Sequence, residues 1–189
     1  NVLEVTQQVH HTAKNPDRSI DLALSVNGVP GATAELKNTF TDQTVRDGRE
    51  QYGKRDPSEP IRRFKCGALV HFAIDQNDIY CSTELEGEDT EFLPFNKGHD
   101  GGPGNPPREN SHRTAYLWEE VWAKDSWMDI LQRFIHIDTE EIRTGGVKVD
   151  EEETIIFPRY HHLECCRQLV ESSREKGDGE DSLMQHSNG

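Results

Sequence analysis

Apolar and polar residues alternate strictly along two short segments near the start of the chain. In residues 20–26 the even positions are apolar and the odd positions are small or polar, and residues 32–37 keep the same order. A turn rich in Gly, Pro and Asn separates the two segments at residues 27–31. Alternation on both sides of such a turn predicts a β-hairpin with one buried face.

The pattern downstream of this hairpin predicts helices and further strands. Thr41-Asp42 are expected to cap an amphipathic helix at residues 43–54, with Val45, Gly48 and Tyr52 facing inward. The other predicted elements are strands at 68–74 and 78–83, a Gly/Pro-rich loop at 98–110, a helix at 114–136 broken near 125–126 with Ser126 as a cap, an exposed connector at 138–154 and a helix at 160–172. No internal repeat is present in the sequence. Together these elements predict an α/β fold.

Length and composition narrow the class of protein. The 189 residues suggest one domain, or one domain and part of another. Only 32% of the residues are apolar, so part of the chain is expected to be loop, tail or incomplete fold. No apolar run approaches the roughly 20 residues that span a bilayer, and no secretory signal is present, which excludes a membrane protein.

The net charge of −14 argues at first against a nucleic-acid partner. The charge is unevenly distributed, however: residues 1–66 hold 10 basic and 9 acidic residues, and residues 67–189 hold 11 basic and 26 acidic ones. An acidic run such as 150–153 is typical of a solvated face or linker. Because DNA binding depends on the local field, the balanced first third leaves DNA open as a partner.

The four cysteines do not form a zinc or disulfide motif. They stand at positions 66, 81, 165 and 166, and we expect reduced, mostly buried thiols. His161, His162, Cys165 and Cys166 have the i,i+4 spacing that can hold a metal ion. The alternative is a helix start with small residues packed inward, which the absence of a second ligand pair favours.

The polar face of the hairpin carries the candidate chemistry. With a turn centred near Val29, residue 21 lies across from 37 and residue 23 from 35. Any pairing in which the residue numbers of two opposite residues add up to an even number puts Asp21, Glu35 and Lys37 on one face, opposite the apolar residues. Two such carboxylates can bind Mg²⁺, and a nearby ammonium can orient a water on the cation. Spacing alone favours a surface salt bridge, worth about 0–1 kcal/mol.

The wider sequence resembles the nuclease motif of type I restriction enzyme R (motor) subunits, in the PD-(D/E)xK family. Asp21, Glu35 and Lys37 occupy its three catalytic places. The other matching strings are 19–30, 34–38, 43–45, 51–52, 70–73, 92–96, 101–107, 114–119 and 157–161. The resemblance extends over essentially all of the chain.

This resemblance implies a restriction-endonuclease-like fold, a mixed central sheet flanked by helices, at residues 1–136. Residues 137–189 would be an acidic connector and the incomplete start of a RecA-like helicase motor. The implied activity is that of a type I site-specific deoxyribonuclease that cuts double-stranded DNA with Mg²⁺. Asp21 and Glu35 would hold the cation, with the Leu36 carbonyl as a further ligand, and Lys37 would position the attacking water.

The resemblance also implies partners and a setting. The nuclease would work with methyltransferase and specificity subunits in the cytoplasm of a prokaryote. Cutting would follow ATP-driven translocation by the motor of the full-length protein. Residues 186–189 look like the opening of a phosphate-binding loop, but the Gly-Lys-Ser/Thr is missing. We therefore interpret the chain as a fragment from which no ATPase activity is expected.

The sequence departs from the family pattern at two places. Some relatives carry a Gln four residues before the position of Tyr52, where this chain has Gly48, although Gln51 is adjacent. Gln51 and Tyr52 are therefore candidate supports of the DNA or metal site, and packing of Tyr52 against the sheet is the alternative. His162 replaces the Gln of the usual Arg-Tyr-His-Gln, which puts an adenine-sensing role in doubt.

A second class of function stays open. The nuclease fold could survive as a catalytically silent DNA-binding or subunit-docking module, although the intact Asp21, Glu35 and Lys37 favour the enzyme. The three tryptophans at 118, 122 and 127 either stack on bases or pack inward, and the second interpretation is favoured. The loop at 98–107 either approaches DNA or a partner or is a plain connector, and the histidines at 10, 11 and 71 are interpreted as ordinary residues.

Overall fold

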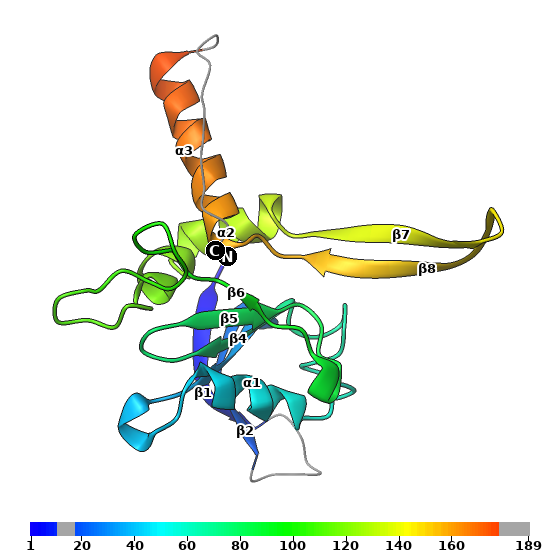
Figure 1. Cartoon of the computed structure of the whole chain (residues 1–189), viewed down its shortest axis with the longest axis horizontal. Helices are drawn as coiled ribbons and strands as arrows, with labels where there is room; N and C mark the ends of the chain where they lie inside the picture. The colour runs from blue at the N-terminus through cyan, green and yellow to red at the C-terminus, as the bar shows by residue number, and fades with distance from the viewer. Residues whose placement is uncertain (11–17, 178–189) are drawn as a thin grey trace.

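The computed structural model describes residues 1–10 and 18–177, which contain a six-stranded sheet with helices on both faces (Figure 1). The strands follow one another in chain order: β1 (Leu3–His10), β2 (Ser19–Val26), β3 (Val29–Leu36), β4 (Val70–Ile74), β5 (Ile79–Ser82) and β6 (Leu93–Pro94). Neighbouring strands are antiparallel except β3 and β4, which run parallel. The sheet is therefore mixed, which confirms the α/β prediction.

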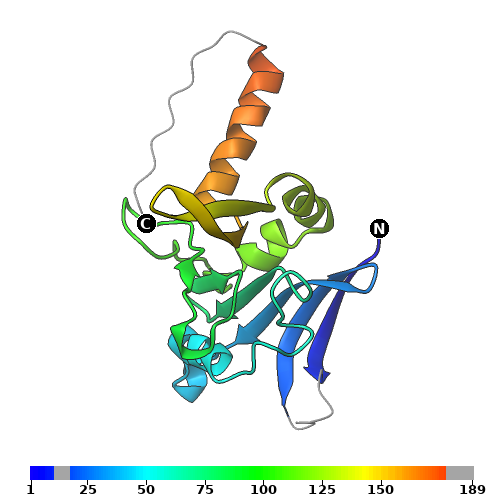
Figure 2. The ribbon, with the colours of Figure 1, turned by 90° about the vertical axis from the view of Figure 1, so that its right-hand side faces the viewer.

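Helices cover the two faces of this sheet separately (Figure 2). On one face α1 (Val45–Gly53) packs through Tyr52 beside Ala73 and Phe92. The other face is covered by the π-helical turn η3 (Leu117–Val121), by α2 (Lys124–Arg133) and by the first turn of α3 (Tyr160–Lys176). Short 3₁₀ turns, η1 (Thr39–Thr41) and η2 (Gly87–Asp89), precede and follow α1 in the chain.

Aromatic rings fill the core on the α2 face. The Phe72 ring meets those of Phe95, Trp122 and Phe157 at centroid distances of 5.8, 5.5 and 5.7 Å. Trp127 is also fully buried. The inward interpretation is therefore confirmed for Trp122 and Trp127, whereas Trp118 is exposed.

The β2–β3 hairpin contains a β-bulge that the sequence prediction misses. A two-residue turn at Asn27-Gly28, with φ of 51° and 82°, pairs Val26 with Val29 and Ser25 with Pro30. The register then shifts, so that Leu24 pairs with Ala32 and Gly31 is the extra residue. The predicted pairing of residue 23 with 35 is wrong, because Ala23 pairs with Thr33. The shift nevertheless returns Asp21 and Glu35 to a shared face.

Helix α1 begins later than the sequence predicts. Thr44 is its N-cap, not Thr41-Asp42, which lie in a preceding turn. The Asp75 carboxylate accepts the Val45 N–H at 2.8 Å and so fixes the first turn of α1 to the end of β4. Gly48 and Tyr52 are buried, as the amphipathic pattern predicts, and Val45 is half-buried.

The helical sequence at 114–136 breaks earlier than expected. The Trp122 N–H bonds to the Leu117 carbonyl at 2.7 Å, an i→i+5 bond that ends the π-turn, and Ala123 is extended. Ser126 does not cap α2, since it is the third residue of the helix and donates to the Val121 carbonyl at 3.0 Å.

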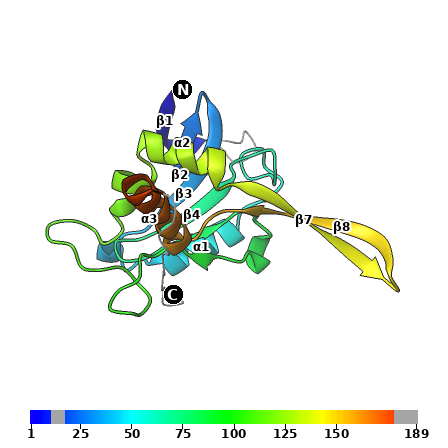
Figure 3. The ribbon, with the colours of Figure 1, turned by 90° about the horizontal axis from the view of Figure 1, so that it is seen from above.

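The predicted connector at 138–154 is wrong in form, because it is a β-hairpin. Strands β7 (His136–Thr144) and β8 (Val147–Ile156) form a separate two-stranded sheet that projects from the body of the molecule (Figures 1 and 3). Gly145 and Gly146 form its turn with φ of 60° and 84°. Its residues are exposed along most of their length, as the acidic composition suggests.

The end of this hairpin leads back to the main core. Ile155 is buried, Phe157 packs against Phe72 and Phe95, and Tyr160 and Leu163 are buried at the start of α3. The domain boundary at 136 stays a prediction, while residues on both sides of it share this core. The RecA-like start of a motor also stays a prediction, and residues 178–189, where its phosphate loop is expected, lie outside the described residues together with His11.

The Gly-rich loop at 98–110 is tied to the sheet, and the four thiols differ in burial. Buried Asn105 accepts the Lys97 N–H at 2.8 Å and donates to the Asn77 carbonyl at 2.8 Å, which ties the loop to the sheet. No disulfide joins any of the four cysteines, all of which lie within the described residues, but only Cys81 is buried, so the expectation of mostly buried thiols is wrong. No helix in the part of the chain that the structure describes is long and apolar enough to cross a membrane.

Candidate functional site

A polar cleft lies between the β2–β3 hairpin and α1, with a volume of about 540 Å³. Its lining includes Asp21 and Lys37 from the predicted site. The other lining residues are Arg18, Ser19, Gln43, Asp47, Glu50, Gln51, Lys54 and Arg55. Four cationic and three anionic side chains therefore meet at this cleft, which agrees with the balanced charge of the first third of the chain.

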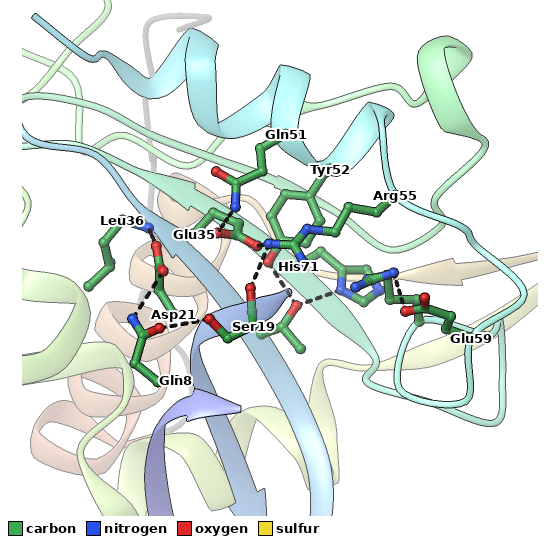
Figure 4. Close-up of polar contacts among 12 residues, drawn as sticks. Gln8, Ser19, Asp21, Glu35, Leu36, Gln51, Tyr52, Arg55, Glu59 and His71 are labelled. Atoms are coloured by element: carbon green, nitrogen blue, oxygen red, sulfur yellow. Dashed lines mark hydrogen bonds and ion pairs between the residues drawn. The ribbon is translucent and has the colours of Figure 1, made fainter. Parts of the chain in front are cut away.

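Asp21 is held at the edge of the cleft by bonds from two neighbouring strands. Its Oδ2 accepts the Leu36 backbone N–H at 2.8 Å, and its Oδ1 accepts the Gln8 side-chain amide at 3.4 Å (Figure 4). The Ser19 hydroxyl in turn donates to Gln8 Oε1 at 2.7 Å. These bonds fix the carboxylate while leaving it half-buried beside the open cleft.

Glu35 is fully buried, although the alternation predicts a solvent-facing carboxylate. The difference arises because α1 covers this face of the sheet. Glu35 Oε1 accepts Arg55 Nη2 at 2.5 Å, and Oε2 accepts Gln51 Nε2 at 2.7 Å (Figure 4). Burial raises the pKa of Glu35 to about 7, against the lowering effect of Arg55, and the nearby Asp21 carboxylate raises it further. The folded site therefore favours the protonated form of Glu35 more than water does.

The Gln51 carboxamide joins two of the three predicted catalytic residues. Its Nε2 donates to Glu35, and its Oε1 accepts the Lys37 ammonium. Lys37 is therefore placed relative to Glu35 through the amide. Asp21, Glu35 and Lys37 come together at one site as the sequence predicts, and Gln51 is drawn into it from α1.

Tyr52 lies beneath the site and not in the lining of the cleft. Its hydroxyl is 2.8 Å from Thr33 Oγ1, which is 2.7 Å from His71 Nδ1, and all three side chains are buried. Burial, with a smaller effect from Arg62, lowers the pKa of His71 to about 3, so that the imidazole is neutral. This network anchors α1 to β3 and β4, which agrees with the packing interpretation of Tyr52.

Gly48 allows α1 to lie close to the sheet. A Cβ at this position would be 3.2 Å from Ala73 Cβ and 3.5 Å from Lys37 Cγ. A Gln at this position would require Ala73 or α1 to shift by a few tenths of an ångström. The amide that contacts Glu35 and Lys37 comes instead from Gln51.

Arg55 is the site residue that the sequence interpretation misses. It lines the cleft, is only 7% exposed and forms an ion pair with Glu35. The signal that points to it is its spacing, because Arg55 and Gln51 are four residues apart and so share a helix face. A basic residue on the helix face that covers Glu35 is a candidate counter-ion for that carboxylate.

The oxygen atoms at this site fit a hard divalent cation. Asp21 and Glu35 offer carboxylates on adjacent strands, and Leu36 offers a backbone carbonyl between Glu35 and Lys37. Within residues 1–10 and 18–177, no group of three or more His, Cys, Asp or Glu side chains is placed to hold a metal ion, and this includes residues 161–166. Mg²⁺ needs only one or two carboxylates because it keeps waters and takes phosphate oxygens.

Comparison with known families places the site within a recognised domain. Residues 1–90 match the family model described as the type I restriction enzyme R protein N terminus. This match confirms the resemblance for just under half of the chain, including every candidate site residue, and the resemblance of residues 91–189 stays a prediction. No curated protein and no solved structure matches the chain.

Proposed function

Taking residues 1–90 as the N-terminal domain of a type I restriction enzyme R protein, we propose that this chain carries the Mg²⁺-dependent endonuclease site of such a protein. The substrate is double-stranded DNA and the fold is of the PD-(D/E)xK type. One observation supports the proposal above the others: Asp21 and Lys37 line one cleft, and Gln51, in the same lining, bonds both to Lys37 and to the buried Glu35.

Each residue has a role that its contacts support. Asp21 faces the cleft with a fixed carboxylate, and Glu35 offers the second carboxylate beneath it. A bound Mg²⁺ would supply a water of lowered pKa and neutralise charge on the phosphate. The two carboxylates and the Leu36 carbonyl would hold that cation. Lys37 would orient the attacking water, with its ammonium kept in place by Gln51.

The complete enzyme would act in a larger assembly. We propose that methyltransferase and specificity subunits select the DNA, and that ATP-driven translocation by a helicase motor elsewhere in the complete protein precedes cutting. This assignment places the protein in the cytoplasm of a prokaryotic cell. ATP would be a cofactor of the complete motor only.

The test compares Asp21→Ala with the unsubstituted protein. The complete R protein, its partner subunits, ATP and Mg²⁺ are incubated with circular DNA that contains the target site. We expect the variant to lose DNA cutting while ATP consumption continues, because the change removes a metal ligand and leaves the motor intact. A matched control is Asp138→Asn on the exposed β7 strand, which should cut as the unsubstituted protein does. Equal cutting by Asp21→Ala would overturn the nuclease assignment.

One observation favours the second candidate, a catalytically silent DNA-binding or docking module. Both Glu35 oxygens already have partners in Arg55 and Gln51, so the carboxylate is compensated without a metal. A Mn²⁺ titration of this chain separates the two functions. The nuclease requires saturable binding that Glu35→Gln weakens, and the silent module requires no difference between the two proteins.

A further inference from the structure

Arg55 occupies an unusual position for a charged side chain. It follows the last turn of α1, where its N–H bonds to the Tyr52 carbonyl at 3.0 Å, and its guanidinium is buried at the floor of the cleft. One nitrogen, Nη2, donates to Glu35 Oε1 at 2.5 Å and to the Ser19 carbonyl at 2.7 Å. A single guanidinium nitrogen therefore ties β2 to β3.

These two strands are the ones that carry the candidate carboxylates. Ser19 lies two residues before Asp21 on β2, and Glu35 lies on β3. The bond to the Ser19 carbonyl therefore holds β2 only two residues away from Asp21. Arg55 thus bridges the two strands beside the candidate carboxylates and holds Glu35 at the same time.

A contribution to folding stability does not by itself explain why Arg55 is buried beside Glu35. Arg55 Nη1 is buried with no hydrogen-bond partner among the described residues. An orphaned buried donor is unfavourable, and a buried ion pair can often be replaced by apolar residues without loss of stability. The position of Arg55 is better explained by what it does to Glu35.

Gln51 completes the restraint on Glu35. With Arg55 on Oε1 and Gln51 on Oε2, the carboxylate cannot rotate without breaking a bond to one of them. Each carboxylate oxygen has two lone-pair directions, so one direction on each stays available after these bonds are made. A fixed carboxylate with remaining lone pairs is prepared for a cation.

We propose that Arg55 is a positioning residue that orients the Glu35 carboxylate for divalent-cation binding. The inference rests on the proposed metal site and adds a residue to it. Outer partners of metal ligands commonly contribute 10–100-fold to metal affinity. Arg55 would therefore act on the affinity for the cation and not on the chemistry that follows.

The experiment measures Mn²⁺ binding to this chain by calorimetry and by the electron paramagnetic resonance of free Mn²⁺. We expect Arg55→Gln to weaken binding about 10–100-fold, because Glu35 loses one of its two restraints. Arg55→Lys keeps the charge but not the fork geometry and should recover part of the affinity. Raising Mg²⁺ should restore the cutting rate of Arg55→Gln in the complete protein, whereas a catalytic role would lower the maximum rate.

Arg62→Gln is the matched control. Arg62 is another buried guanidinium of the same loop, and its Nη1 pairs with Glu59 at 2.5 Å. It should lose stability in urea unfolding while its Mn²⁺ affinity stays within about twofold, since Arg62 donates to Glu59 and to the Asp56 carbonyl, and the charge of Glu35 acts on it less than that of Glu59 does. If Arg55→Gln does not fold, Arg55→Lys alone carries the test, with an intermediate loss expected.

The outcomes separate this inference from the proposed function. Unchanged or tighter Mn²⁺ binding by folded Arg55→Gln, or by Arg55→Lys where only that variant folds, would overturn the positioning role. An equal loss in Arg62→Gln would also overturn it, because the effect would then be general to the loop. Absence of saturable Mn²⁺ binding, or no change in both Asp21→Asn and Glu35→Gln, would overturn the metal site itself.

Discussion

At the scale of single residues, Glu35 is a fully buried carboxyl group with a hydrogen-bond partner on each oxygen. Water is excluded from its carboxylate, which forms an ion pair with Arg55 through one oxygen and accepts a hydrogen bond from the Gln51 amide on the other. Burial is the dominant effect and raises the pKa of Glu35 to about 7. Its ionisation is therefore coupled to the stability of the whole fold.

Glu35→Gln should reveal this coupling as a pH-dependent difference in stability. The folded-state pKa of about 7 lies above the ordinary value of 4.5, so the stability contributed by protonated Glu35 is present below pH 4.5 and is lost as the pH rises through 7. The variant does not titrate at this position. Relative to Glu35→Gln, the unsubstituted chain should lose about 3 kcal/mol of unfolding free energy across this interval.

Urea unfolding of both proteins at pH 4.5, 6 and 8 measures this difference. His71 has the opposite dependence, since its pKa is lowered to about 3 and its contribution is lost as the pH falls below 6.5. It is present in both proteins and cancels in the comparison. A difference that does not change between pH 4.5 and 8 would contradict the burial of an ionisable Glu35.

The sequence is sufficient to bring the three catalytic candidates together, but not to define their surroundings. Alternation puts Asp21 and Glu35 on one face whenever the residue numbers of opposite residues add up to an even number. The shared face is therefore predicted correctly although the predicted register is wrong. Burial of Glu35 depends on where α1 packs, and nothing in the local sequence of β3 encodes it. Arg55 is missed for the same reason.

At the scale of elements, the loop between α1 and β4 carries two buried arginines, Arg55 in the lining of the cleft and Arg62 paired with Glu59. Its end is closed by backbone bonds from Gly67 to the Arg63 carbonyl at 2.7 Å and from Ala68 to the Ile61 carbonyl at 2.8 Å. A Cβ on Gly67 would be only 2.4 Å from the Ile61 carbonyl oxygen. The loop can therefore close only over a residue without a side chain.

Gly67→Ala is expected to destabilise the chain by about 1–3 kcal/mol, because backbone must move to admit the methyl group. The free energy of unfolding in urea measures the change. Gly102→Ala is the control, since its Cβ would be 3.5 Å from the nearest atom, the His99 carbonyl oxygen. A loss at Gly67 no larger than that of the control would show that the close approach is not rigid.

Elements with a strong alternation or amphipathic pattern are predicted within a few residues, and the others are not. The β2–β3 hairpin and α1 belong to the first group. The β7–β8 hairpin is missed because charged residues, including Glu140 opposite Glu152, stand at positions where an apolar face is the usual signal. The early break before α2 depends on a π-turn, which has no simple sequence signature.

At the scale of the whole molecule, the negative charge and the cleft lie on different parts of the structure. The β7–β8 hairpin holds like charges directly opposite one another, at Glu140 and Glu152 and at Glu141 and Glu151. Such pairs are unfavourable in a sheet. The net charge of −14 therefore describes this hairpin and the acidic later part of the chain more than it describes the site.

Removing the tip of this hairpin should strengthen non-specific DNA binding at low salt. Replacing residues 139–153 by two glycines removes six acidic and two basic residues and changes the net charge from −14 to −10. The weaker repulsion should act over about a Debye length, roughly 10 Å at 0.1 M salt, so the gain should shrink as salt rises. Fluorescence anisotropy with a short duplex at 50 and 200 mM salt measures it.

A matched variant reaches the same charge with the strands intact. Changing Glu140, Glu141, Glu151 and Glu152 to Gln also brings the net charge to −10. Both proteins should bind the duplex equally and keep their core, because the replaced residues are exposed. A gain in the deletion alone would mean that the hairpin blocks DNA by its volume and not by its charge.

The bulge at Gly31 accommodates one extra residue on the β3 side of the β2–β3 hairpin. A two-residue turn leaves one residue too many between Asp21 and Glu35 for regular pairing, and the bulge takes it up beside Trp127, whose ring lies 3.4 Å from a Cβ built at Gly31. The hairpin can therefore lose this one residue and keep its faces, with Leu24 still opposite Ala32. Loss of one residue within β2 would exchange the faces beyond it, so tolerance of deletions here depends on where they fall.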